Sequence, residues 1–244
     1  MTTISPLFEA ASDLLKDKVI LITGATGGFG DPVSMALARH GASVILLAKN
    51  LRKVEALYDR IVEAGYAQPA IYPMNLEGAT EPDYADLYEN INKEFGRIDG
   101  LIHCAAFFGA PTVFEQSDSV TWHQVHQVNL HAPYLLTRAC LPLLTKSNRA
   151  SVVFMVDDKE GAYWDAYQVS KQGLTAMAGL LANEYDGGHI RFNCLNPGKT
   201  RTALHLRAYP AADNNDKLPT AADHIDKFLY LMSDQLDENG EMFS

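Results

Sequence analysis

The sequence predicts a doubly wound α/β fold, in which a parallel sheet carries helices on both of its faces. Short apolar segments alternate with longer helical patterns from residue 19 to residue 232. The apolar segments are hydrophobic on both faces, as strands buried inside a parallel sheet are. A glycine-rich octet directly follows the first of them and precedes a helical pattern, which gives the order strand, turn, helix.

The elements alternate strictly along the chain, so we expect parallel strands joined by right-handed helical crossovers. The short apolar segments predict the strands Val19–Thr23, Ser43–Leu47, Ala70–Met74, Gly100–Cys104, Ser151–Val156 and Ile190–Leu195. The helical patterns predict Pro32–His40, Leu51–Ala64, Asp83–Phe95, Thr121–Leu144, Trp164–Tyr185 and Ala221–Met232. The polar stretch Arg207–Pro219 follows the last of these strands, where open α/β sheets place ligand-binding loops. It is a candidate substrate lid, with a plain surface loop as an equal alternative.

Composition and charge limit the kinds of partner that this chain can have. We expect residues 1–244 to form a single domain, because the chain has no linker, internal repeat or low-complexity tract. The net charge of −10 argues against nucleic acid and against an anionic membrane surface as the main partner. The first 17 residues lack a secretory signal, and no apolar run is long enough to span a bilayer. Three widely spaced cysteines support neither a disulfide framework nor a zinc site, so we expect a cytoplasmic protein.

The octet Thr23–Gly30 reads Thr-Gly-Ala-Thr-Gly-Gly-Phe-Gly and has the properties of a phosphate-binding turn. Such a turn needs positive φ angles and close backbone approach, and glycines such as Gly24, Gly28 and Gly30 allow both at low cost. The next helix would point its free N–H groups and the positive end of its dipole at a pyrophosphate. The octet, with Thr26 and Phe29 inside it, therefore predicts the dinucleotide site of a Rossmann-type domain, although glycines also mark ordinary tight turns.

The end of the second predicted strand indicates which dinucleotide would bind. An NAD site has an acidic residue there for the ribose hydroxyls, whereas an NADP site has a cation for the 2′-phosphate. This strand runs into Ala48-Lys49-Asn50, so the acid is absent and Lys49 is the candidate phosphate ligand. The sequence favours NADP(H) over NAD(H), against the alternative that Lys49 is simply an exposed lysine.

Tyr167 and Lys171 are the candidate acid/base pair. They lie four residues apart in a predicted helix and therefore share one of its faces. A tyrosine hydroxyl ordinarily has a pKa near 10, which is too high for efficient proton exchange at neutral pH. A nearby ammonium favours the phenolate and lowers that pKa. Tyr167 could then protonate a carbonyl oxygen as a hydride arrives, or take the proton from an alcohol.

From Lys18 to about Phe243 the chain resembles the short-chain dehydrogenases/reductases, and within them the bacterial oxoacyl-reductase-like subgroup. The octet matches the cofactor motif of that family, and Tyr167-x-x-x-Lys171 matches its catalytic pair. The resemblance implies an NADP(H)-dependent oxidoreductase that interconverts a carbonyl and a secondary alcohol. It also implies a homodimer or homotetramer.

The resemblance also assigns roles to individual residues. Tyr167 would be the general acid/base, Lys171 would bind the nicotinamide ribose, and Asn129 would support a proton relay. The remaining cofactor contacts implied by the resemblance are Asn75 and Leu76 at the adenine, Ala105 after the fourth strand, and Pro197, Gly198, Thr200 and Thr202 beside the nicotinamide.

The chain departs from the family where a serine normally holds the substrate oxygen. Positions 152 to 166 contain no serine or threonine, and the expected serines align with Asp157 and Asp158. An ionised Asp157 would oppose Lys171, a protonated Asp157 could donate a hydrogen bond as the serine does, and an Asp157 turned to solvent would do neither. This departure keeps open a second function, in which a degenerate member binds NAD(P) with little or no turnover as a sensor or structural partner.

Several other residues are weaker candidates for a role in the site. Cys104 replaces a family asparagine and is expected to affect stability more than chemistry. We expect no metal site, because His123, His126 and His131 have no carboxylate or cysteine to complete a ligand set. Phe107 and Phe108 could line an apolar substrate pocket or pack in the core, and Trp164 is expected to pack. The net negative charge of this chain would repel an acidic carrier protein, so we do not expect a substrate attached to one. We expect a small free carbonyl compound or alcohol as the substrate.

Overall fold

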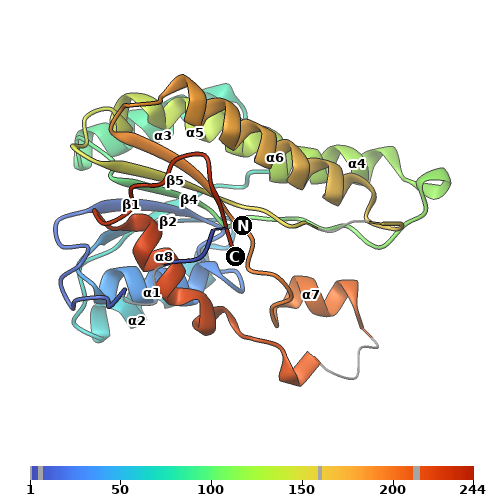
Figure 1. Ribbon diagram of the computed structural model, residues 1–244, viewed down its shortest axis with the longest axis horizontal. Coiled ribbons are helices and arrows are strands. Elements are labelled where there is room, and N and C mark those ends of the chain that lie inside the picture. Colours follow the sequence, from blue (N-terminus) through green and yellow to red (C-terminus); the bar gives the residue numbers. More distant parts are fainter. Residues whose placement is uncertain (1, 5–7, 159–160, 211–214) are drawn as a thin grey trace.

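The computed structural model describes residues 2–4, 8–158, 161–210 and 215–244 and contains one parallel sheet with helices on both faces (Figure 1). The seven strands lie in the order β3-β2-β1-β4-β5-β6-β7. Their bounds are β1 Val19–Thr23, β2 Ser43–Ala48, β3 Ala70–Pro73, β4 Gly100–His103, β5 Ala150–Met155, β6 Ile190–Leu195 and β7 Met242–Phe243. Strand order changes direction between β1 and β4, which opens a crevice at the carboxyl ends of the strands. The predicted doubly wound fold is confirmed.

Two apolar cores, one on each face, hold the helices against the sheet. One core contains residues of α3, α5 and α6, and the other contains residues of α1, α2 and α8, as the two layers of Figure 1 show. The helix bounds are α1 Gly30–Arg39, α2 Leu51–Glu63, α3 Glu81–Glu94, α4 Ser119–His126, α5 Ala132–Leu144, α6 Asp165–Glu184, α7 Ala203–Ala208 and α8 Ile225–Met232. Each buried large apolar side chain contributes about 1.5–3 kcal/mol, so the cores fix the layer arrangement. No helix among the described residues has both the length and the hydrophobicity to cross a bilayer.

The helices bury the side chains that their spacing predicts. In α2 the buried residues are Val54, Leu57 and Ile61, and in α3 they are Tyr84, Leu87 and Ile91. Both sets follow a spacing of three and four residues, which places them on one face of a helix. The polar residues between them lie toward solvent, so each of these helices is a one-sided cover for the sheet.

All six predicted strands are present, with ends within one residue of those expected. The seventh strand, β7, is absent from the sequence prediction. It has only two residues, which is too short for any hydrophobic pattern to mark it. It exists because it pairs with β6 at the edge of the sheet, where Cys194 lies beside Met242 and Leu195 beside Phe243.

The predicted helices need three corrections. Thr121–Leu144 is not one regular helix, because a π-helical segment, η2 Gln127–His131, separates α4 from α5. Ala221–Met232 begins as the 3₁₀ turn η4 Ala221–His224 before α8 starts. Arg207–Pro219 is not a uniform loop, since Arg207 belongs to the unpredicted helix α7 and η3 Asn215–Lys217 is a 3₁₀ turn. Residues 211–214 of that candidate lid lie outside the described residues, and η1 Phe114–Gln116 is a further 3₁₀ turn that the sequence did not predict.

The glycine octet connects β1 to α1 through backbone contacts too close for side chains. Gly24 has a φ of +62°, and a Cβ atom there would lie 2.8 Å from the Cα of Ala105 in the segment after β4. A Cβ on Gly30, the first residue of α1, would lie 2.1 Å from the carbonyl oxygen of Gly24. The octet therefore brings α1 against the end of β1 only because these two positions are glycine.

We predict that Gly30→Ala destabilises the protein by about 1–3 kcal/mol, because the added methyl overlaps main-chain atoms that cannot rotate away. Urea denaturation followed by circular dichroism measures the change. Gly179→Ala is the matched control: it lies inside α6, with nothing within 4 Å of the added Cβ. The control should stabilise the protein by about 0.5–1 kcal/mol. Equal stability of Gly30→Ala and the unmodified protein would contradict the close packing of the octet.

Candidate active site

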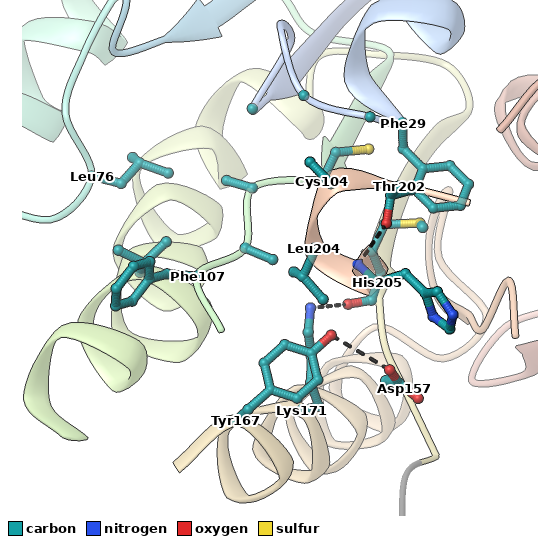
Figure 2. Close-up of a pocket in the computed structure, with 18 of the residues that line it drawn as sticks. Phe29, Leu76, Cys104, Phe107, Asp157, Tyr167, Lys171, Thr202, Leu204 and His205 are labelled. Carbon is teal, nitrogen blue, oxygen red and sulfur yellow. Dashed lines mark hydrogen bonds between the residues drawn. The ribbon is translucent and has the colours of Figure 1, made fainter. Parts of the chain in front are cut away.

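A cavity of about 400 Å³ lies at the carboxyl ends of the strands and is lined by the octet, by the segments after β2 to β6, and by α6 and α7 (Figure 2). It brings together most of the residues predicted to form the site. Those that line it are Gly24, Thr26, Gly28, Phe29, Lys49, Asn75, Leu76, Ala105, Asp157, Tyr167, Lys171, Pro197, Gly198, Thr200 and Thr202. Gly30 and Asn129 are not among the lining residues.

Asn129 acts on the site through the backbone. It lies in the π-helical segment η2 and is fully buried. Its Oδ1 accepts a hydrogen bond from the N–H of Phe107 at 2.7 Å, and its Nδ2 donates to the carbonyl of Phe107 at 2.9 Å. Nδ2 also lies 3.1 Å from Oγ of Ser170 on α6. One side-chain amide thus fixes the segment after β4 relative to the helix that carries Tyr167 and Lys171.

Tyr167 and Lys171 occupy one face of α6, as their spacing predicted. The Nζ of Lys171 lies 5.7 Å from the centroid of the Tyr167 ring and donates a hydrogen bond to the carbonyl of Met155 at 2.7 Å. Burial lowers the pKa of Lys171 to about 8, and the Asp157 carboxylate is the main influence that raises it. The lysine is therefore held beside the tyrosine by the end of β5, at a pKa close to neutral.

Asp157 points into the site rather than into solvent. It follows β5 and is half-buried, and its Oδ2 accepts a hydrogen bond from the Tyr167 hydroxyl at 3.5 Å, the contact dashed in Figure 2. This geometry excludes the solvent-facing alternative for Asp157, whereas Asp158 is exposed. Burial first, and the Asp157 carboxylate second, raise the pKa of Tyr167 above its ordinary value. Burial and Asp157 therefore both oppose ionisation of the tyrosine.

The opposite end of the cavity has the features expected of a phosphate site. A Cβ on Gly28 would lie 3.1 Å from the side chain of Thr202, so the octet and the segment after β6 meet across this end. Lys49 is exposed directly after β2 and forms no ion pair with any described residue. Asp31, the acid that follows the octet, pairs with Arg60 and does not cap α1.

Thr200 depends on a histidine that the sequence analysis did not identify. The hydroxyl of Thr200 lies 3.1 Å from Nε2 of His224 and donates to the carbonyl of Pro197 at 3.3 Å. Nδ1 of His224 lies 3.4 Å from Nζ of Lys227, and burial and this lysine both lower the pKa of the histidine. A neutral His224 accepts from Lys227 and donates to Thr200, which positions the Pro197–Thr202 segment. No local pattern marks His224, because its partner is 24 residues away.

Several aromatic side chains of the cavity were also missed or underestimated. Trp164, expected to pack, lines the cavity together with Phe107. His205 lines it from α7, and Tyr209 lines it from the residue after α7. No pattern in the sequence indicated either residue, because α7 itself was not predicted. Phe107 therefore lies in a pocket, while Phe108 is buried behind it.

The remaining candidates take no visible part in the chemistry. Cys104 lines the cavity, and burial raises the pKa of its thiol to about 12, so the thiol stays protonated at neutral pH. His123 and His126 each bond the carbonyl four residues earlier in α4. In the part of the chain that the structure describes, no three histidine, cysteine or acidic side chains gather as they would around a metal ion.

Comparisons with known proteins place the chain among short-chain dehydrogenases. The family model described as short chain dehydrogenase matches residues 18–212. The uncharacterised oxidoreductase YciK of Escherichia coli K12 is 38% identical over 230 residues, which cover 93% of this chain and 90% of YciK.

Solved structures agree with this family match. A protein of Shigella flexneri 2a, assigned to the short-chain dehydrogenases and complexed with NADP, has a TM-score of 0.92 and 37% identity, covering 96% of this chain and 98% of its own. A protein of Escherichia coli CFT073 with the same assignment, complexed with NADPH, has a TM-score of 0.92 and 38% identity over the same shares.

The electrostatic coupling inside the site generates a prediction. Asp157→Asn removes the carboxylate that raises the pKa of Lys171, so this pKa should fall below about 8. NMR titration of lysine labelled at the ε-carbon measures it, and Lys171→Met assigns the signal. Asp158→Asn is the control, since Asp158 is the exposed neighbour, and it should leave the titration unchanged. If Asp157→Asn leaves the Lys171 titration in place, the carboxylate does not act on the lysine.

Proposed function

Because this chain belongs to the short-chain dehydrogenase/reductase family, we propose that it is an NADP(H)-dependent oxidoreductase that interconverts a carbonyl and a secondary alcohol. The observation that carries the proposal is the placement of Tyr167 and Lys171 in one cavity with the glycine octet. A tyrosine hydroxyl that faces this cavity can exchange a proton with a substrate oxygen, and the octet can hold a pyrophosphate at the opposite end.

The residues present fit NADP(H). Gly24, Gly27 and Gly28 line the cavity and carry no side chains, so their backbone can be approached closely by phosphate oxygens. Lys49 would bind the 2′-phosphate, and Asn75 and Leu76 would contact the adenine. Pro197, Gly198 and the segment through Thr202 would contact the nicotinamide. The structures of relatives that contain NADP and NADPH support this choice of cofactor.

The reaction places distinct demands on the side chains around the substrate carbonyl. When bound, NADPH would supply the hydride that reduces the carbonyl carbon. Tyr167 gives its hydroxyl proton to the carbonyl oxygen, which completes a secondary alcohol, and solvent then returns a proton to Tyr167. Lys171 stabilises the phenolate left on Tyr167, and Asn129 holds the Phe107 backbone that forms one wall. In the oxidative direction Tyr167 removes the proton of the alcohol.

Asp157 has two opposing consequences for this chemistry. By raising the pKa of Tyr167 it keeps the phenol protonated, as carbonyl reduction requires, but it also makes the phenol a weaker acid. The Asp157 carboxylate lies at the Tyr167 hydroxyl, where the family has a serine. This replacement is the observation that supports one alternative function. In that alternative the protein binds NADP(H) with little or no turnover. NADPH binding without NADPH consumption across a panel of carbonyl compounds would establish the alternative.

The proposed roles predict different losses for the two members of the pair. Tyr167→Phe should lower turnover at least about 100-fold and leave the Kd for NADPH nearly unchanged, because the lost hydroxyl acts in the transition state. Lys171→Ala should reduce both turnover and NADPH affinity. Absorbance at 340 nm with a panel of ketones and aldehydes measures turnover, and fluorescence titration measures affinity. Tyr163→Phe, at an exposed tyrosine of the preceding loop, is the matched control. Equal loss of NADPH affinity in both variants would make the pair structural.

Cofactor preference is predicted from Lys49. The unmodified protein should bind NADPH about tenfold or more tightly than NADH, because a lysine–phosphate contact contributes on the order of 1–2 kcal/mol. Lys49→Asp should reverse the order, since it repels the 2′-phosphate and offers an acceptor to the ribose hydroxyls of NADH. Lys53→Asp is the charge-matched control, because Lys53 is an exposed lysine in the first turn of α2 that does not line the cavity. Preferential binding of NADH by the unmodified protein would show that Lys49 does not read the 2′-phosphate.

A further inference from the structure

A series of aromatic rings leads from Tyr167 to α7 along the lining of the cavity. Trp164 packs at 6.1 Å from Tyr167 and at 5.8 Å from Tyr209, measured between ring centroids. Tyr209 in turn lies 4.8 Å from His205. These three rings and Phe107 all line the cavity and are only partly buried, so ring surface remains available to a bound molecule. We call Trp164, His205 and Tyr209 the aromatic wall.

The aromatic wall is supported from behind. Phe108 is 4% exposed and contacts Tyr167 edge-on at 5.3 Å and Trp164 at 5.4 Å. These residues belong to a small third core, separate from the two that flank the sheet. Arg207 of α7 donates a hydrogen bond to the carbonyl of Gly109 at 2.7 Å, which ties α7 to the segment after β4. The rings are therefore positioned before any substrate arrives.

Charge at this end of the cavity is unfavourable for an anionic substrate. The lysines and arginines among the described lining residues are Lys49, at the phosphate end, and Lys171, which donates to the carbonyl of Met155. Asp157 places a carboxylate beside the Tyr167 hydroxyl, where the substrate oxygen must approach. A carboxylate or phosphate on the substrate would meet this repulsion at the Tyr167 hydroxyl.

We propose that the substrate of this site is an uncharged aryl ketone, in which an aromatic ring adjoins the carbonyl. The inference rests on the proposed function. The carbonyl oxygen of such a compound meets the Tyr167 hydroxyl while its ring packs on Trp164 and Tyr209. Offset and edge-on ring contacts favour an aromatic ring over a saturated ring of the same size. Reduction of an aryl ketone gives a secondary alcohol with its hydroxyl beside the ring.

Three matched ketones test the inference by binding. Acetophenone is the neutral aryl ketone, 4-acetylbenzoate adds a negative charge, and cyclohexyl methyl ketone replaces the aromatic ring with a saturated one. Each is titrated into the protein saturated with NADP⁺, which cannot reduce it. The chain has two tryptophans, so Trp122→Phe leaves Trp164 as the reporter, and its fluorescence follows ketone binding at the aromatic wall.

The proposal requires acetophenone to bind about tenfold or more tightly than either of the other two ketones. Tyr209→Leu, which keeps apolar surface but removes a ring, should weaken acetophenone binding about three- to tenfold and leave cyclohexyl methyl ketone unchanged. Tyr163→Leu is the control, because Tyr163 is 58% exposed and does not line the cavity.

Each other outcome overturns a specific claim. Equal or tighter binding of 4-acetylbenzoate would disprove the exclusion of anions, and equal binding of cyclohexyl methyl ketone would disprove the aromatic preference. Saturable binding of none of the three ketones to the NADP⁺ complex would overturn the inference as a whole. Failure of the unmodified protein to bind NADP⁺ would instead overturn the proposed function, so the two failures are distinguishable.

Discussion

The hydrogen bonds of one buried amide, that of Asn129, hold the candidate active site together. This side chain bonds both backbone groups of Phe107 and reaches Ser170, so it joins the segment after β4, the π-helical segment and α6. A buried amide with all of these partners is stable, and loss of any one partner would leave a polar group unsatisfied. The π-helical segment matters because single π turns occur within helices at functional positions, where they redirect a side chain. The position of Phe107 in the lining of the cavity follows from these hydrogen bonds.

The titratable centre depends on burial as much as on charge. Lys171 is 3% exposed and Tyr167 is 5% exposed, so both groups lose hydration that would stabilise their ionised forms. That loss raises the pKa of Tyr167 and lowers the pKa of Lys171, so burial favours the neutral form of each group. The Asp157 carboxylate then favours the ammonium of Lys171 and disfavours the phenolate of Tyr167. The three groups therefore form one coupled system, in which a change at Asp157 is felt at both of the others.

Helix α7 decides what kind of molecule the cavity can hold. It is short, and none of its residues is fully buried. Its fixed points are the Thr202 hydroxyl, which caps its first turn by accepting from the N–H of His205 at 3.2 Å, and Arg207, which bonds the carbonyl of Gly109. These two contacts bring ring surface from a late segment of the chain against Trp164. The substrate end of the cavity is thus built by a segment with little intrinsic helical stability, positioned by its neighbours.

The sequence alone determined six strands of the sheet, the octet and the Tyr167–Lys171 pair, because each depends on a local pattern of residues. Apolar runs indicate buried strands, glycines indicate a tight turn, and a spacing of four residues indicates one helix face. It could not determine β7, the π-helical segment or α7, which are short and exist through contacts with distant segments. It listed three alternatives for Asp157 without choosing among them, and the packing of the end of β5 against α6 excluded the solvent-facing one. His224 and the aromatic wall were likewise decided by tertiary structure, because the partners that give those side chains their roles lie far away in the chain and only folding brings them together.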